Sequence, residues 1–174
     1  MPFKDENYTP FYAVEPLIKY LPSTPITIWC PFDKEWSAYV VRLKEAGHKV
    51  IHSHIDNGQD FFTYHPSEPY DMIISNPPFS KKDKILERVY ALDKPFALLL
   101  PLVTLQGIKR YKYFKNGIQI LSFDKRINFH NETHFDEPEK GSPFIPAYFC
   151  KDFLPKDLIF EELSVYSRPL LSSL

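Results

Sequence analysis

The stretch "YDMIISNPPFS", residues 70–80, decides which fold the sequence predicts. Its first six residues are mostly apolar and predict a buried strand. That strand must stop at Pro77 and Pro78, because proline has no backbone N–H to donate to a sheet. Asn76 precedes a proline and is therefore restricted to an extended conformation. The pattern predicts a strand that ends in a rigid turn, with Asn76 and Phe79 at its tip.

Composition predicts an ordinary soluble domain. The chain has 174 residues, of which 44% are hydrophobic and 25% charged, so we expect one domain over residues 1–174. The formal net charge is −1, and binding to nucleic acid would therefore need a local basic patch. No apolar run reaches the roughly 18 residues of a membrane span. The start, "MPFKDENYTP", lacks a signal-peptide core. Cys30 and Cys150 lie in apolar runs and suit a reducing compartment, so we expect a cytoplasmic protein.

Strand and helix patterns alternate along the chain. Strands are predicted at 26–30, 48–56, 70–75, 95–102 and 118–124. Helices are predicted at 33–47, at 81–92 and, less clearly because of Gly107, at 104–116. This alternation predicts an α/β fold, a mostly parallel sheet with helices on both faces. Two closing runs, 146–153 and 157–163, predict a hairpin and hence an antiparallel edge strand pair. Residues 127–145 carry turn and polar residues and predict a long loop.

Ligands of such sheets bind outside the carboxyl ends of the strands. Three distant stretches are expected to meet there. They are "CPFDKEW" (30–36) after the first strand, Asp56 after the second and "NPPF" (76–79) after the third. The sequence therefore predicts a site at this edge of the sheet.

The "NPPF" turn has a chemistry of its own. The amide oxygen of Asn76 and the carbonyl oxygen of Pro77 are two neighbouring acceptors, which match the two N–H donors of an exocyclic NH2 group. Phe79 offers a flat ring on which a base can stack. Two acceptors also stabilise the positive charge that develops when the nitrogen attacks an electrophile, for which a sulfonium methyl group is suited. The alternative is a strand-ending turn with a buried ring.

These residues carry a family resemblance. "NPPF" resembles the catalytic motif of S-adenosylmethionine-dependent adenine-N6 methyltransferases, in which Asp, Asn or Ser precedes two prolines and an aromatic residue. "YTPFYAVEPLIKYLP" (8–22) resembles their amino-terminal segment, where a Thr-Pro pair precedes a helix beside the cofactor. "KRINFH" (125–130) and "GSPFIPAYFC" (141–150) resemble the target-side loop and strand of small phage-type DNA enzymes. The resemblance covers about residues 8–153.

The resemblance implies a Rossmann-like methyltransferase fold, S-adenosylmethionine as cofactor and adenine N6 in nucleic acid, DNA rather than RNA, as acceptor. It also implies that residues 127–145 form a loop on the side of the target. If the chain is encoded by a phage, the protein is expected in the cytoplasm of the host. The implied catalytic residues are Asn76, Pro77, Pro78 and Phe79. The implied cofactor-binding residues are Tyr8, Thr9, Pro10, Cys30, Pro31, Phe32, Asp33, Asp56, Asp60 and Phe61.

Several of these residues have a second interpretation. The resemblance implies that Asp56 binds the ribose of the cofactor. The local sequence alone is also consistent with a solvent-exposed acidic residue in a loop. Asp33 lies near the methionine end of the cofactor, or caps the helix that follows it. Thr9 is expected either beside the cofactor or at the start of a helix. Phe61 is expected either at the adenine ring of the cofactor or in the hydrophobic core. One departure stands out: the family usually has a glycine-containing loop after the first strand, and "CPFDKEW" has no glycine.

Four basic residues are candidates for phosphate contacts: Lys109, Arg110, Lys125 and Arg126. The alternative for the first two is a solvated helix face. His52 and His54 share one face of a strand, but no third ligand is spaced to join them, so no metal site is predicted.

Two other functions remain open at this point. The glycine-free loop favours an inactive chain that kept the fold and binds nucleic acid or protein, for instance in phage counter-defence. The same "NPPF" chemistry also suits methylation of a glutamine amide in a protein. Only about 20 residues, in a short acidic loop (His130–Ser142 and its flanks), could recognise a target. Either specificity is low, the substrate is small or structured, or a protein partner supplies recognition.

Overall fold

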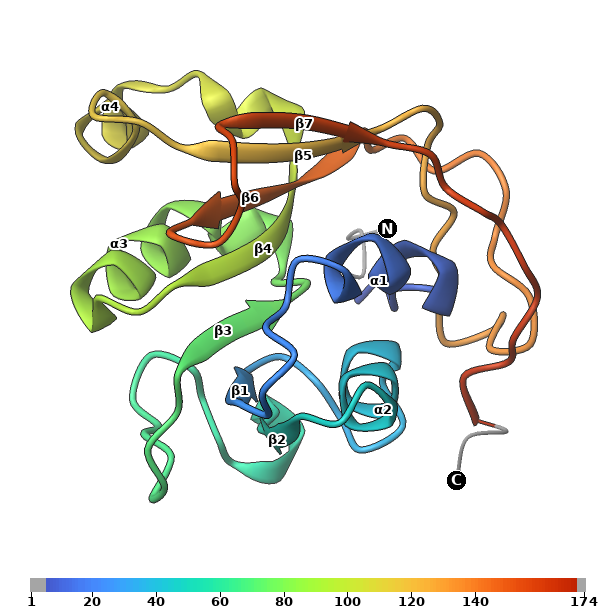
Figure 1. The fold of residues 1–174 in the computed structure, drawn as a ribbon. Coiled ribbons are helices and arrows are strands. Elements are labelled where there is room, and N and C mark those ends of the chain that lie inside the picture. Colours follow the sequence, from blue (N-terminus) through green and yellow to red (C-terminus); the bar gives the residue numbers. More distant parts are fainter. Residues whose placement is uncertain (1–5, 172–174) are drawn as a thin grey trace.

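The computed structural model describes residues 6–171, which form a seven-stranded sheet with helices on both faces (Figure 1). Residues 1–5 and 172–174 lie outside the described part, as does half of the stretch used to predict the absence of a signal peptide. The strands are β1 (Thr27–Cys30), β2 (Lys49–His52), β3 (Met72–Ser75), β4 (Phe96–Pro101), β5 (Gln119–Phe123), β6 (Pro146–Lys151) and β7 (Leu158–Glu161). The α-helices are α1 (Phe11–Ile18), α2 (Ala38–Glu45), α3 (Lys82–Leu92) and α4 (Ile108–Phe114). Three short 3-10 helices are η1 (Ile55–Asn57), η2 (Phe79–Lys81) and η3 (Leu102–Leu105).

The sheet is mostly parallel, as predicted. Its strand order is β2-β1-β3-β4-β6-β5-β7, and β6 alone runs antiparallel to both of its neighbours. In Figure 1, α1 and α2 lie on one side of this sheet and α3 and α4 on the other. Strands β3 and β4 are buried along their whole length, which is why their sequences are continuous apolar runs.

The predicted hairpin of β6 with β7 is wrong, because β5 lies between them. β6 is buried at five of its six residues and pairs with β4 over all six. A strand so apolar needs neighbours on both edges, and β4 and β5 supply them. β7 alternates between exposed and half-buried residues, the pattern of an edge strand, and it pairs with β5 in parallel.

Two predicted helices have different bounds. Helix α2 begins at Ala38 rather than at Asp33, and its N-cap is Ser37, whose Oγ accepts the Lys34 N–H at 2.9 Å. Asp33 does not cap the helix, because its carboxylate accepts a hydrogen bond from Ser75 at the end of β3. The predicted helix 104–116 is divided into η3 and α4 by Gly107, whose backbone is extended.

The segment 127–145 is a long loop, as predicted, and contains no helix or strand. It is attached to the amino-terminal segment by two backbone hydrogen bonds of 2.8 Å between Tyr8 and His130. The Phe135 ring stacks on Tyr8 with centroids 5.6 Å apart. These contacts place the loop beside the edge where β1 and β3 end. Within residues 6–171, every helix is too short or too polar to cross a membrane.

Candidate active site

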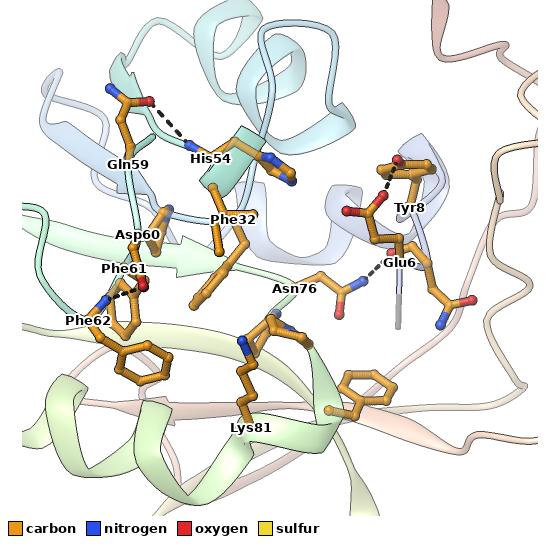
Figure 2. Close-up of a pocket in the computed structure, with 16 residues that line it drawn as sticks. Glu6, Tyr8, Phe32, His54, Gln59, Asp60, Phe61, Phe62, Asn76 and Lys81 are labelled. Carbon is orange, nitrogen blue, oxygen red and sulfur yellow. Dashed lines mark hydrogen bonds between the residues drawn. The ribbon is translucent and has the colours of Figure 1, made fainter. Parts of the chain in front are cut away.

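A cavity of about 230 Å³ opens at the carboxyl edge of β1, β2 and β3 (Figure 2). It is lined by the loops that follow these three strands and by the segment that precedes α1. The three stretches that the strand-end rule expects to meet lie near this edge, although not all of their residues line the cavity. Nine of the predicted site residues do: Tyr8, Pro31, Phe32, Asp60, Phe61, Asn76, Pro77, Pro78 and Phe79.

Asn76 holds the most unusual polar group of the cavity wall. Its Nδ2 donates a hydrogen bond of 2.8 Å to the carbonyl oxygen of Asn7. Its Oδ1 is buried and has no hydrogen-bond partner among the described residues. A buried acceptor without a partner costs about 1–3 kcal/mol, so each such group in a folded protein calls for an explanation. The amide is therefore fixed by its nitrogen, while its oxygen, in a residue that lines the cavity, lacks a donor within residues 6–171.

The prolines turn the chain directly after Asn76. Pro78 is extended, and Phe79 begins η2. The Phe79 ring is only 7% exposed and meets the ring of Phe144 edge to face, with centroids 5.1 Å apart. Phe129 makes a similar contact at 6.5 Å. Both partners belong to the segment 127–145, so this loop fixes the orientation of the Phe79 ring.

Aromatic rings form the opposite wall of the cavity. The rings of Phe32 and Phe61 lie 4.8 Å apart, and Phe62 lies next to Phe61 at 5.7 Å. Figure 2 shows Phe32 projecting toward the cavity from the loop that follows β1. Asp60 also lines the cavity, and its Oδ1 accepts the N–H of Phe62 at 3.0 Å. This wall combines flat apolar surfaces with one carboxylate.

A smaller cavity lies behind the first and shares Tyr8, Phe32 and Asn76 with it. Asp33 and Thr9, both predicted near the cofactor, line this second space. Asp33 is buried, and burial raises its pKa to about 7 even though hydrogen bonds from Ser75 and Ser37 act in the opposite direction. Its Oδ2 accepts the Ser75 hydroxyl at 2.6 Å.

A chain of buried hydroxyl groups continues from Thr9 into the protein. Thr9 Oγ1 donates to the Tyr39 hydroxyl at 3.4 Å, which lies 3.0 Å from the Tyr148 hydroxyl. Tyr148 in turn donates to the carbonyl oxygen of Ala13 at 2.8 Å. This network joins α1, α2 and β6 behind the cavity and holds its rear wall in place.

Three of the predicted cofactor residues line neither cavity. Cys30 and Pro10 are buried in the core. Asp56 lies in η1, which carries its carboxylate outward, where the Lys34 ammonium group is 2.7 Å away. Asp60, four residues further along the chain, is the acid that reaches the cavity after β2. Asp56 therefore lies outside the lining of both cavities, and its predicted contact with the cofactor ribose stays a prediction.

The four basic residues predicted to contact phosphates have different surroundings. The Arg110 guanidinium donates to Asp83 at 2.6 Å and to the carbonyl oxygen of Thr104 at 2.7 Å. Lys125 donates to the carbonyl oxygen of Leu163 at 3.1 Å. Arg126 is exposed and lies 3.5 Å from the Ser142 carbonyl oxygen. Lys109 is exposed and forms no ion pair within residues 6–171.

The cavity is also lined by residues that the sequence patterns did not indicate: Glu6, Asn7, His54, Ile55, Gln59 and Lys81. Lys81 lies two residues after the motif, and its position alone was a usable signal. Asn7 acts through its backbone carbonyl, which no side-chain pattern reveals.

Potential metal ligands gather at one place in the described part of the chain. Atoms of Glu6, His54 and Asp56 lie within 4.8 Å of one another. His54 Nδ1 already accepts the Asp56 N–H at 3.1 Å, and the Lys34 ammonium already pairs with the Asp56 carboxylate. We assign no metal to this group.

This arrangement of strands and loops is also found in a solved structure. The chain is similar to the crystal structure of the methyltransferase subunit of the type I restriction-modification system from Streptococcus thermophilus, with a TM-score of 0.55 and 14% sequence identity. The fold is methyltransferase-like. The match covers 90% of this chain but only 47% of that subunit, so the chain spans about half its length. No protein-family model and no curated protein matches the sequence.

Proposed function

We propose that the protein is an S-adenosylmethionine-dependent methyltransferase that acts on the exocyclic N6 amine of adenine in nucleic acid, with DNA as the favoured acceptor. One observation carries this proposal. The Asn76 amide is fixed by the Asn7 carbonyl, while its oxygen stands buried and unpaired at the wall of a cavity. An amine with two N–H groups is the donor that such an oxygen lacks.

The "NPPF" residues then have distinct roles. The Asn76 oxygen and the Pro77 carbonyl accept hydrogen bonds from the amine and stabilise the positive charge that develops on its nitrogen. Because these acceptors are held before the reaction begins, they lose no reorganisation energy during it. The Phe79 ring, aligned by Phe129 and Phe144, bounds the space for the base. The amine nitrogen gains a methyl group and releases one proton to water.

The residues on the other wall fit the proposed cofactor. When bound, S-adenosylmethionine supplies an electrophilic methyl group. Phe32 and Phe61 offer flat rings to its adenine, and Asp60 is placed to accept hydrogen bonds from its ribose. Asp33 and Thr9, which line the adjoining smaller cavity, are placed near its amino-acid end. In this proposal Asp60 binds the cofactor ribose, the role that the family resemblance implied for Asp56.

The direct test is a panel of acceptors incubated with a methyl-labelled donor. Single-stranded DNA, duplex DNA, RNA and a glutamine-containing protein are supplied in turn. The proposal expects label in adenine N6 of DNA, identified by digestion to nucleosides. Label in RNA adenine would change the favoured acceptor, and label in glutamine alone would overturn the nucleic-acid proposal.

A second candidate rests on the glycine-free loop after β1, from which Phe32 lines the cavity. In this alternative the chain is a catalytically inactive methyltransferase-fold protein that binds nucleic acid or protein. Calorimetry with S-adenosylmethionine separates the two. Micromolar binding supports the enzyme, and absence of binding supports the inactive module.

A further inference from the structure

A groove leads out of the cavity and runs between α3 and α4. Its first part, of about 400 Å³, shares Phe62 and Lys81 with the cavity. Its second part, of about 330 Å³, shares Asp83, Lys84 and Lys109 with the first. The shared residues make these spaces neighbours, from Lys81 near the "NPPF" turn to Tyr113 on α4.

The charge of this groove differs from that of the whole chain. Four exposed lysines line it: Lys81, Lys84, Lys109 and Lys112. None of them forms an ion pair within residues 6–171. The acid Asp83 is neutralised by Arg110, whose guanidinium lies 2.6 Å from its carboxylate. Glu87 is the remaining acidic residue of the lining. A chain of formal net charge −1 therefore has a locally basic path that starts at its candidate active site.

Arg110 also explains why the lysines stay unpaired. Besides Asp83, its guanidinium binds the carbonyl oxygens of Thr104 and Gln106, and this fixes η3 and the start of α4 against α3. The lysines on either side then project from a rigid frame. Helix α4 buries none of its residues, and Ile108, which lines the groove, is 98% exposed. A surface of this kind, basic and partly apolar, is open for a partner.

We propose that this groove binds the phosphate backbone of the nucleic-acid strand that carries the target adenine. The inference rests on the proposed function for the identity of the acceptor. Lysines contact phosphates as point charges and release the counterions condensed on the strand. Because the groove starts at Lys81, two residues after Phe79, a strand held along it presents its bases at the mouth of the cavity.

The test is fluorescence anisotropy of a labelled oligonucleotide, single-stranded and duplex, at several salt concentrations and without cofactor. The variant Lys84→Gln/Lys109→Gln removes two charges from the groove. We expect its affinity to fall at least tenfold, and the slope of log K against log salt to decrease by about 1.4 for a single strand or 1.8 for a duplex. The control Lys44→Gln/Lys156→Gln removes two exposed charges elsewhere and should change affinity less than twofold.

Four outcomes would overturn the proposal. Equal weakening by both double variants shows non-specific attraction, and no weakening by the groove variant excludes the groove. Binding of poly-L-glutamate as tight as that of the oligonucleotide assigns the groove to acidic proteins instead. If the unmodified protein binds no oligonucleotide, nucleic acid is excluded as the partner of the groove. Groove-dependent binding without methyl transfer by the same protein would keep this inference and reject the proposed function.

Discussion

The cavity and the groove meet at Lys81 but are built in opposite ways. In the cavity wall, polar groups are buried and fixed by neighbours, as in the bond from Asn76 to the Asn7 carbonyl. In the groove, the four lysines are exposed and form no ion pair within residues 6–171. A buried and fixed site suits discrimination between atoms, whereas an exposed row of charges suits attraction without discrimination. The comparison teaches that recognition of the base and attraction of the strand reside in different residues and can be altered separately.

The largest expected effect tests the cavity side of this comparison. Asn76→Ala removes the unpaired acceptor, and we expect methyl transfer to fall about 10²–10³-fold or more, the usual range for loss of one preorganised hydrogen-bonding group. Oligonucleotide affinity should stay unchanged, because the groove is untouched. Steady-state assays and anisotropy on the same preparation measure both quantities. Asn116→Ala, at an exposed position just after α4, is the matched control. Unchanged activity in Asn76→Ala would reject the role of this residue.

A second prediction concerns the buried acid behind the cavity. Burial raises the pKa of Asp33 to about 7, so the folded chain holds a proton that the unfolded chain loses near pH 4. Unfolding therefore releases a proton between about pH 4 and 7, and this carboxyl makes the protein less stable as the pH rises. Between pH 5 and pH 8 the free energy of unfolding should fall by roughly 2–3 kcal/mol relative to Asp33→Asn.

Urea unfolding of both proteins at the two pH values measures this difference. The comparison with Asp33→Asn cancels the buried histidines, such as His54 and His130, whose pKa values are lowered by burial and whose effect has the opposite sign. A difference that does not change with pH would show that Asp33 stays ionised.

A third prediction tests the hydroxyl network that supports the rear wall. Tyr148→Phe removes the hydroxyl that bonds to Ala13 and to Tyr39 and leaves a buried hydroxyl with fewer partners. The free energy of unfolding should fall by about 1–3 kcal/mol. Tyr111→Phe, which alters an exposed tyrosine on α4, should change it by less than about 0.5 kcal/mol. Equal effects of the two variants would contradict a structural role for the network.

The smallest effect separates two neighbours on α4. Arg110→Ala breaks the half-buried contacts to Asp83 and Thr104 and should lower the free energy of unfolding by about 1 kcal/mol. Lys109→Ala should leave stability within about 0.5 kcal/mol but weaken oligonucleotide binding. Thermal unfolding and anisotropy of both variants measure the two effects. The distinction fails if Lys109→Ala destabilises the chain as much as Arg110→Ala.

Local sequence patterns correctly predicted the parts of the fold that depend on neighbouring residues. The continuous apolar runs of β3 and β4 and the prolines after Asn76 act within a few residues, and their positions were predicted to within one or two residues. The partner of β6 depends instead on burial by distant strands, and no local pattern distinguishes pairing with β4 and β5 from a hairpin with β7.

The candidate site shows the same division. Nine of the predicted residues line the main cavity, because the strand-end rule depends only on strand direction and order. Asp56 does not line the cavity, because it lies in a turn of 3-10 helix, Ile55–Asn57, and its carboxylate pairs with Lys34. Arg110 and Lys109 are adjacent basic residues, and the sequence does not distinguish their roles. The contact of Arg110 with Asp83, which does distinguish them, joins two separate helices.

The position of β6 has a consequence for synthesis of the chain. β5 pairs only with β6 and β7, and both follow it in the sequence. While the polypeptide emerges from the ribosome, residues 119–123 therefore have no strand to join until residue 146 and those beyond it have been made. Strands β1 to β4 can assemble earlier. The residues that line the main cavity all precede β4 in the sequence, so they are synthesised before the strands that complete the far part of the sheet.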